Sequence, residues 1–136
     1  MDCELCKATG ETLLWHGQHC RVILVEDKDY PGFCRVVWND HVKEMTDLSF
    51  SMRTEIINIV LAVEETVREV MHPDKINLAS LGNMTPHLHW HIIPRYADDK
   101  HFPNPVWGEP LRASRISTIN DIRSRISTSL MNKLPI

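Results

Sequence analysis

The stretch HLHWHIIPR, residues 87–95, places a histidine at every second position and apolar residues between them. In a β-strand, side chains alternate between the two faces of the sheet, so His87, His89 and His91 would share one face. Three neighbouring imidazoles bury little apolar area and repel one another when protonated, so stability alone does not favour this arrangement. The strand therefore carries a metal site, a catalytic site or a mixture of the two.

The residues before this strand predict two paired strands and one long helix. Residues 19–26 and 33–39 are β-branched runs separated by a Pro-Gly turn, which is typical of antiparallel strands. From residue 49 to residue 71, apolar residues recur at three- and four-residue spacing, which predicts one amphipathic helix. Ser49 or a polar residue just before it can cap the start, and Pro73 cannot continue the end.

The rest of the chain predicts another strand, a loop and a second helix. Residues 75–83 favour a strand that forms a hairpin with the histidine strand, which we expect Pro94 to end. Residues 97–113 predict an irregular loop. Isoleucines and a leucine at helical spacing over 116–130 predict a C-terminal helix, packed on the sheet or on a partner subunit. The fold class is therefore α+β with a mainly antiparallel sheet.

Length and composition indicate one domain over residues 1–136, with a C-terminal loop and helix over 97–136. No apolar run approaches the roughly 18 residues of a membrane span, and the polar N-terminus predicts a cytoplasmic protein. The formal net charge of −3 argues against a nucleic-acid polymer as partner. Four cysteines in a reducing compartment argue against a disulfide framework. We expect no membrane partner and no organic cofactor.

A CxxC motif, Cys3 to Cys6, makes residues 1–11 a candidate metal-binding segment. The same spacing serves redox chemistry, but that form is expected near a βαβ pattern, which the predicted elements lack. Same-face residues on a strand lie roughly 7 Å apart, so three strand histidines would reach one ion only if the strand were bent. One of them could instead complete a Cys2His2 site, which is closed to water and structural.

The pattern of HLHWHII resembles the H-φ-H-φ-H-φ-φ signature of the histidine triad (HIT) family, φ being apolar. The resemblance extends over most of the chain, through the CxxC, the paired strands, the long helix and the glycine-containing hairpin. It implies a HIT-like fold and a homodimer of two α+β subunits with a continuous sheet. It also implies hydrolysis or transfer of nucleotidyl groups.

The resemblance also implies roles for the two later histidines. His89 matches the nucleophile, and a neutral imidazole can attack an α-phosphorus to form a phosphoramidate, which divides one hard displacement into two. His91 matches the residue that donates hydrogen bonds to nonbridging phosphate oxygens.

In members of the family that carry the CxxC, two histidines complete a zinc site. They are the first triad histidine and a histidine at the end of the second strand, which match His87 and His41. The resemblance therefore implies zinc bound by Cys3, Cys6, His41 and His87. The alternative is that both cysteines stay reduced in a frayed N-terminus.

The sequence departs from the family at two supporting positions. Many members carry Gly-His in the second strand, where this chain has Gly-Phe, with Phe33 in place of the histidine. Met84 stands where a serine or threonine hydroxyl usually assists the leaving group, and Thr85 could substitute for it. Gly82 and Asn83 remain candidates to approach a phosphate.

Contacts to the rest of a nucleotide are predicted more loosely. Glu26 and Asp27 are candidates for the ribose hydroxyls, or else solvated charges in a turn. Arg95 could attract a polyphosphate tail, or else be a surface cation. Trp107 either closes over a bound base or packs.

The leading hypothesis is a nucleotide hydrolase for dinucleoside polyphosphates or nucleoside phosphoramidates, acting through a nucleotidyl-histidine intermediate. The first alternative is a nucleotidyltransferase or phosphorylase that uses the same intermediate. The second is a weakly catalytic nucleotide-binding module, which the loss of the Gly-His and hydroxyl positions would favour.

Overall fold

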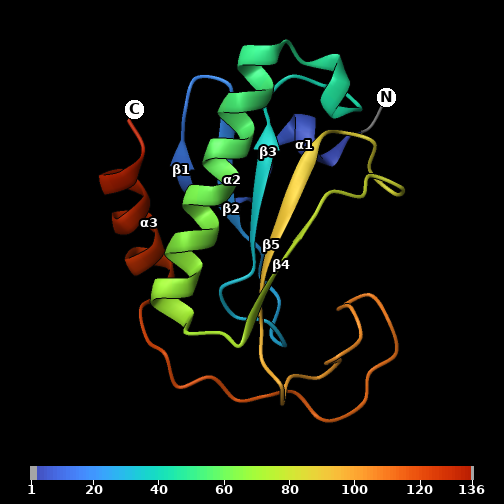
Figure 1. The fold of residues 1–136 in the computed structure, drawn as a ribbon, viewed down its shortest axis with the longest axis vertical. Coiled ribbons are helices and arrows are strands. Elements are labelled where there is room, and N and C mark those ends of the chain that lie inside the picture. Colours follow the sequence, from blue (N-terminus) through green and yellow to red (C-terminus); the bar gives the residue numbers. More distant parts are fainter. Residues whose placement is uncertain (1–2, 136) are drawn as a thin grey trace.

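The computed structural model describes residues 3–135, so the predicted limits at residues 1–2 and 136 lie outside the described part, and the single domain stays a prediction. Five antiparallel strands form one sheet in the order β1-β2-β3-β5-β4 (Figure 1). The predicted α+β class is confirmed. The elements are α1 (Glu4–Lys7), β1 (Thr12–His16), β2 (Cys20–Leu24), β3 (Cys34–Trp38), the 3-10 turn η1 (Met45–Asp47), α2 (Phe50–Met71), β4 (Lys75–Ala79), β5 (His89–Arg95) and α3 (Ile122–Lys133).

The predicted long helix is α2, and its ends follow from local chemistry. The Oγ of Ser49 accepts a hydrogen bond from the backbone N–H of Met52, which satisfies one free donor at the helix start. At the other end, His72 takes a left-handed conformation with φ +48°, and Pro73 follows it. Proline cannot donate the next helical hydrogen bond, so α2 ends here.

The predicted strand pair is also confirmed, as β2 and β3, which pair over their whole lengths. The turn between them ends at Gly32, whose φ of +85° favours glycine. A Cβ at this position would lie 2.7 Å from the Cγ of Met71, so only glycine lets the turn approach the end of α2 so closely.

The two faces of the sheet are covered differently (Figure 1). Helices α2 and α3 pack on one face and enclose the main core, to which Leu88 and Ile92 contribute the apolar side of the histidine strand. The opposite face carries the histidines, and there Leu5 of α1 packs against Ile23 and Val37. None of the helices within residues 3–135 is both long enough and apolar enough to cross a membrane.

Two predicted boundaries are wrong. The histidine strand continues through Pro94 to Arg95, and proline is tolerated because β5 pairs only with β4 at that point. The C-terminal helix begins at Ile122, so Ile116 and Ile119 precede it. In the Ser- and Thr-rich stretch before α3, the backbone N–H of Ile119 donates to a serine hydroxyl instead of joining a helix.

Two positions on α2 test the packing of this core. We expect Ile56→Ala, at a fully buried position, to lower the free energy of unfolding by about 3 kcal/mol, because the substitution removes apolar contacts and leaves a cavity. The matched change Leu61→Ala alters a side chain that is 51% exposed on the same helix, and we expect an effect below about 0.5 kcal/mol. Urea denaturation at fixed protein concentration measures both. Equal losses in the two variants would contradict the assignment of the buried face.

Candidate active site and metal centre

The strand β5 places His89 and His91 side by side on the face opposite the main core. Their ring centroids lie 4.8 Å apart, and both side chains are largely buried. Antiparallel pairing with β3 puts Arg35 opposite His91. His87 lies just before the strand, and its ring turns toward the N-terminal cysteines.

His89 has one ring nitrogen committed and one free. Its Nδ1 lies 2.6 Å from the backbone carbonyl oxygen of His87. A carbonyl oxygen only accepts, so Nδ1 carries the proton and Nε2 keeps its lone pair. Burial lowers the pKa of His89, and the positive charge of Arg35 lowers it further, while the bond to the carbonyl opposes the shift. The ring is therefore a neutral imidazole with a nucleophilic nitrogen at neutral pH.

His91 is also neutral, and its Nδ1 lacks a partner. Burial, together with the charge of Arg35 and the neighbouring His89, lowers the pKa of His91 to about 3. The Nδ1 atom is buried and makes no hydrogen bond with the described residues. The side chain of Phe33 meets this ring edge-on, with centroids 5.7 Å apart. An aromatic edge offers no hydrogen-bonding atom, which leaves Nδ1 unsatisfied.

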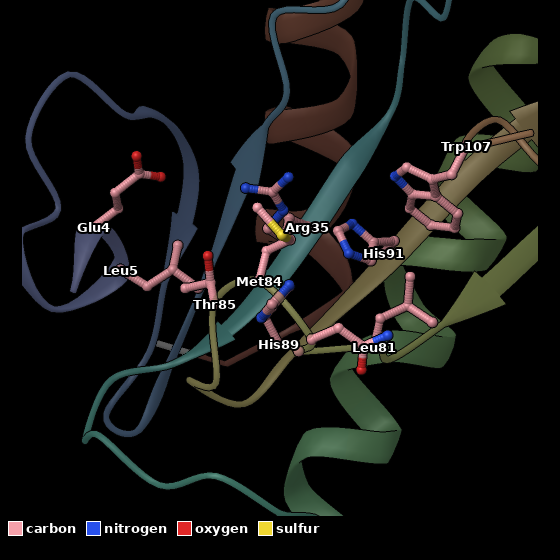
Figure 2. A pocket seen from close by; sticks show the side chains of 11 residues that line it. Glu4, Leu5, Arg35, Leu81, Met84, Thr85, His89, His91 and Trp107 are labelled. Atoms are coloured by element: carbon pink, nitrogen blue, oxygen red, sulfur yellow. The ribbon is translucent and has the colours of Figure 1, made fainter.

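A cavity of about 360 Å³ opens over the two histidines (Figure 2). Polar groups at its base face an apolar rim, in which Met84 is 95% exposed and Trp107 lies edge-on to His91 at 5.1 Å. Its lining is Glu4, Leu5, Arg35, Leu81, Gly82, Asn83, Met84, Thr85, His89, His91 and Trp107. This combination of a concave surface, a free nucleophilic nitrogen and a cation suits an anionic small molecule.

A second cluster lies beside the cavity, where Cys3, Cys6, His41 and His87 come together. All four candidate ligand atoms lie within 4.8 Å of one another. Both sulfurs lie 3.4 Å from Nδ1 of His87, and Nδ1 of His41 lies 3.2 Å from that atom. Ligands around a tetrahedral zinc ion are separated by about 3.4 to 3.8 Å, given Zn–N and Zn–S bonds of about 2.1 and 2.3 Å, so these distances are close to the ones that zinc requires. The cluster could therefore hold a metal ion.

The protonation of this cluster also fits a metal. The Nε2 of His87 lies 2.6 Å from the carbonyl oxygen of Trp38, so it donates a proton there and leaves Nδ1 free to bind a metal. Burial raises the pKa of Cys3, but hydrogen bonds from the backbone and side chain of Cys6 and from the backbone of Leu5 outweigh it, so the pKa of Cys3 is lowered overall. The pKa of Cys6 is raised, by burial and by the neighbouring Cys3, so Cys3 is the thiol that ionises first. A lowered pKa favours the thiolate, which is the form that binds metal.

A family model described as HIT domain matches residues 8–98. The chain belongs to the HIT family. A search of curated proteins finds no significant match.

Solved structures of HIT proteins share this fold. A histidine triad protein from Bradyrhizobium japonicum has a TM-score of 0.73 and 27% sequence identity, and the alignment covers 90% of each chain. One from Marinobacter aquaeolei VT8 has a TM-score of 0.72 and 28% identity, covering 92% of this chain and 89% of that chain. A zinc-bound histidine triad family protein from Mycobacterium smegmatis has a TM-score of 0.71 and 18% identity, covering 98% and 96%. The last similarity shows the fold alone.

The HIT cavity includes only some of the predicted nucleotide contacts. Gly82, Asn83 and Thr85 line it, as does Met84. Glu26 lies elsewhere and accepts a hydrogen bond of 2.8 Å from the Thr12 hydroxyl.

Two further residues predicted to contact the nucleotide also lie outside the cavity. The carboxylate of Asp27 accepts from the backbone N–H of Asp29 within a turn. The side chain of Arg95 is buried rather than at the surface, and it donates hydrogen bonds to Asp99, Asn77 and the carbonyl oxygen of Asn104. These bonds tie the loop that carries Trp107 to the end of β5.

The prediction missed Arg35, which lines this HIT cavity beside His91. A signal was available, because it is the one charged residue in the apolar run FCRVVWN and shares a strand face with Phe33. Leu81 was also missed, and no pattern in the hairpin turn distinguishes it from a surface residue.

Asp99 tests how firmly the loop is anchored. Burial raises the pKa of Asp99, but hydrogen bonds from Arg95 and from backbone N–H groups lower it more, so the folded pKa lies below the ordinary value. A lowered folded pKa stabilises the protein above the unfolded pKa of about 3.9, and this stabilisation is lost as the pH falls through the folded pKa. We expect Asp99→Asn to reduce the free energy of unfolding by about 3 kcal/mol at pH 7, and by less below about pH 4.

The neighbouring Asp98 supplies a matched control. Its side chain is 72% exposed and pairs with Arg115 at the surface, so we expect Asp98→Asn to change the free energy by less than about 1 kcal/mol. Urea unfolding at both pH values measures the two variants. A deficit for Asp99→Asn that stays constant with pH would refute the buried ion pair as its source.

Proposed function

We propose that this HIT protein is a nucleotide hydrolase. It cleaves a phosphoanhydride or phosphoramidate bond at the α-phosphate of a nucleotide, in the class of dinucleoside polyphosphates and nucleoside phosphoramidates. The observation that supports it is the neutral His89 ring, whose Nδ1 is held by a carbonyl oxygen while Nε2 remains free at the cavity. Membership of the HIT family agrees with nucleotide chemistry.

The proposed reaction has two displacements at phosphorus. In the first, Nε2 of His89 forms a bond to the α-phosphorus while the bond to the leaving group breaks, and the leaving group departs with the bonding electron pair and takes its proton from solvent. In the second, water attacks the same phosphorus, gives up a proton to solvent and releases the nucleoside monophosphate. The N–P bond breaks and its electron pair returns to Nε2.

The residues around His89 would orient the phosphate during these steps. His91 would donate a hydrogen bond to a nonbridging oxygen, as the family resemblance implies. Asn83 offers an amide donor, and Gly82, with φ +81°, allows the backbone to approach a ligand closely. Thr85 supplies a hydroxyl at the cavity wall, where Met84 has none. Because Met84 is so exposed, it contributes an apolar surface at the rim.

We propose zinc as the ion for Cys3, Cys6, His41 and His87. Two sulfur and two nitrogen ligands suit zinc, and four protein ligands leave no open position, so the role would be structural. The HIT protein from Mycobacterium smegmatis is described as zinc-bound. The ion would hold α1 against the sheet, and no organic cofactor is proposed.

The proposed partners are a small-molecule nucleotide and a second copy of this chain, in a cytoplasmic setting. The homodimer is proposed from the family resemblance, and light scattering that returns the mass of one chain would refute it. The formal net charge of −3 supports a small anion held by a local cation, and it argues against a nucleic-acid polymer or a membrane surface as partner.

Replacement of the nucleophile tests the reaction. We expect His89→Ala to lower kcat/KM on diadenosine polyphosphates or adenosine phosphoramidate by about 10⁴-fold or more, because the covalent route is lost. The wild-type protein should form a nucleotidyl adduct, seen by mass spectrometry after an alkaline denaturing quench, since phosphoramidate bonds hydrolyse in acid. The exposed His16 gives a matched control, and His16→Ala should keep both activity and adduct.

Two further outcomes separate the alternative functions. Added inorganic phosphate that diverts the product from nucleoside monophosphate to diphosphate would indicate a phosphorylase. If wild type and His89→Ala act at the same rate on every substrate and no adduct forms, the enzyme proposal fails and a nucleotide-binding module remains.

The proposed zinc site is tested by its cysteines. We expect about one zinc per chain in protein purified without chelator, and almost none in Cys3→Ser, because three ligands hold the ion more weakly than four. A chelator should lower the melting temperature of the wild type but not that of Cys3→Ser, since only a bound ion can stabilise by mass action. His16→Ala should behave as wild type. Absence of zinc from the wild type, with no response to chelator, would refute the site.

A further inference from the structure

We propose that Arg35 binds the nonbridging oxygens of the phosphate attacked by His89, and so provides the fixed positive charge of the site. This assignment rests on the proposed function. It goes beyond the family signature, because the residue lies on β3, outside the histidine strand.

The position of Arg35 follows from strand pairing. It is the second residue of β3, with His91 opposite it on β5. The side chains share the sheet face that forms the base of the cavity, and Figure 2 shows Arg35 beside the two histidines.

The bonding of Arg35 differs from that of the other arginines on this face. Arg21 binds the carboxylate of Glu11, and Arg95 binds that of Asp99. The Nε of Arg35 is buried without a hydrogen bond, and its guanidinium makes no ion pair within residues 3–135. The charges of Glu11 and Glu4 act on Arg35 from a distance, and Glu4 also lines the cavity, but neither carboxylate forms an ion pair with the guanidinium. An anion that enters the cavity could therefore pair with it directly, and it would satisfy the buried Nε.

The chemistry of guanidinium suits the reacting phosphate. It stays protonated and presents its donors in a planar fork, which can bind two phosphate oxygens at once. Negative charge on these oxygens must be held while His89 attacks, and Phe33 contributes no donor beside His91. Arg35 is the cation that lines the cavity, so it is placed to bind this charge.

The proposal predicts a loss of binding that depends on phosphate. We expect Arg35→Gln, made in the His89→Ala background to prevent turnover, to weaken AMP binding about 10-fold to 100-fold, as loss of charged hydrogen bonds does. Adenosine binding should not change, because adenosine lacks the phosphate. Arg35→Lys should retain part of the AMP affinity. Isothermal titration calorimetry with AMP, adenosine and inorganic phosphate measures each variant.

Controls separate direct contact from a structural role. Arg125→Gln makes the same charge change at an exposed position of α3 and should bind AMP as the parent does. Arg35→Gln should keep the urea midpoint of its parent or raise it, because no internal bond of the guanidinium is lost. Equal weakening of AMP and adenosine, or a lowered midpoint, would indicate a structural role instead. Absence of phosphate-dependent binding in the parent would also overturn the proposal.

Reactivity supplies a readout that a structural residue would not change. With active enzyme and the two diastereomers of a nucleoside α-thiophosphate substrate, we expect Arg35→Gln to reduce the rate difference between them, because the group that distinguishes the two nonbridging positions is gone. An unchanged difference would place Arg35 away from the phosphate.

If His89 forms no adduct but AMP binding still depends on Arg35, the hydrolase proposal fails while the phosphate contact stands.

Discussion

Two short hydrogen bonds to backbone carbonyls determine what the histidines of this strand can do. The Nε2 of His87 donates to Trp38, and the Nδ1 of His89 donates to His87, each over 2.6 Å. The two rings are therefore held as opposite tautomers, two residues apart. The lone pair on Nδ1 of His87 faces the cysteines, and the lone pair on Nε2 of His89 faces the cavity. The backbone carbonyls of Trp38 in β3 and of His87 just before β5, rather than the residue type, assign the two roles.

The short helix α1 joins the candidate metal site to the cavity. Cys3 and Cys6 flank Glu4 and Leu5, both of which line the cavity wall. A helix of four residues is too short to be stable by itself. Packing of Leu5 on the sheet and the bond of its carbonyl with Arg21 position it. An ion bound to the cysteines would add a constraint at the same place, so a structural metal would also shape the wall of the proposed active site.

The regular spacing of apolar residues made much of this fold predictable from the sequence. Elements with irregular strand pairing could not be predicted in this way. The spacing of apolar residues predicted α2 correctly. The strand β1 was missed because the register shifts between Leu13 and Trp15, which puts two adjacent buried residues where alternation would expect one. In the site, the motif located His89, but local sequence could not show which arginine has an internal partner. That depends on contacts such as Arg95 with Asp99, which form only in the folded chain.

The aromatic side chain at Phe33 affects how the site is polarised. With an aromatic edge against it, His91 has no partner for Nδ1, and its low pKa keeps it neutral. Arg35 lies opposite His91 on the neighbouring strand β3, and its guanidinium stays charged near neutral pH. On the proposed assignment, a phosphate meets one fixed cation and two neutral rings. A buried donor without a partner is unfavourable, so a bound anion that accepts from the Nε of Arg35 would relieve this cost. Arg21 and Arg95 bind carboxylates of the fold, whereas Arg35 forms no ion pair with the described residues and lines the cavity, where a ligand can reach it.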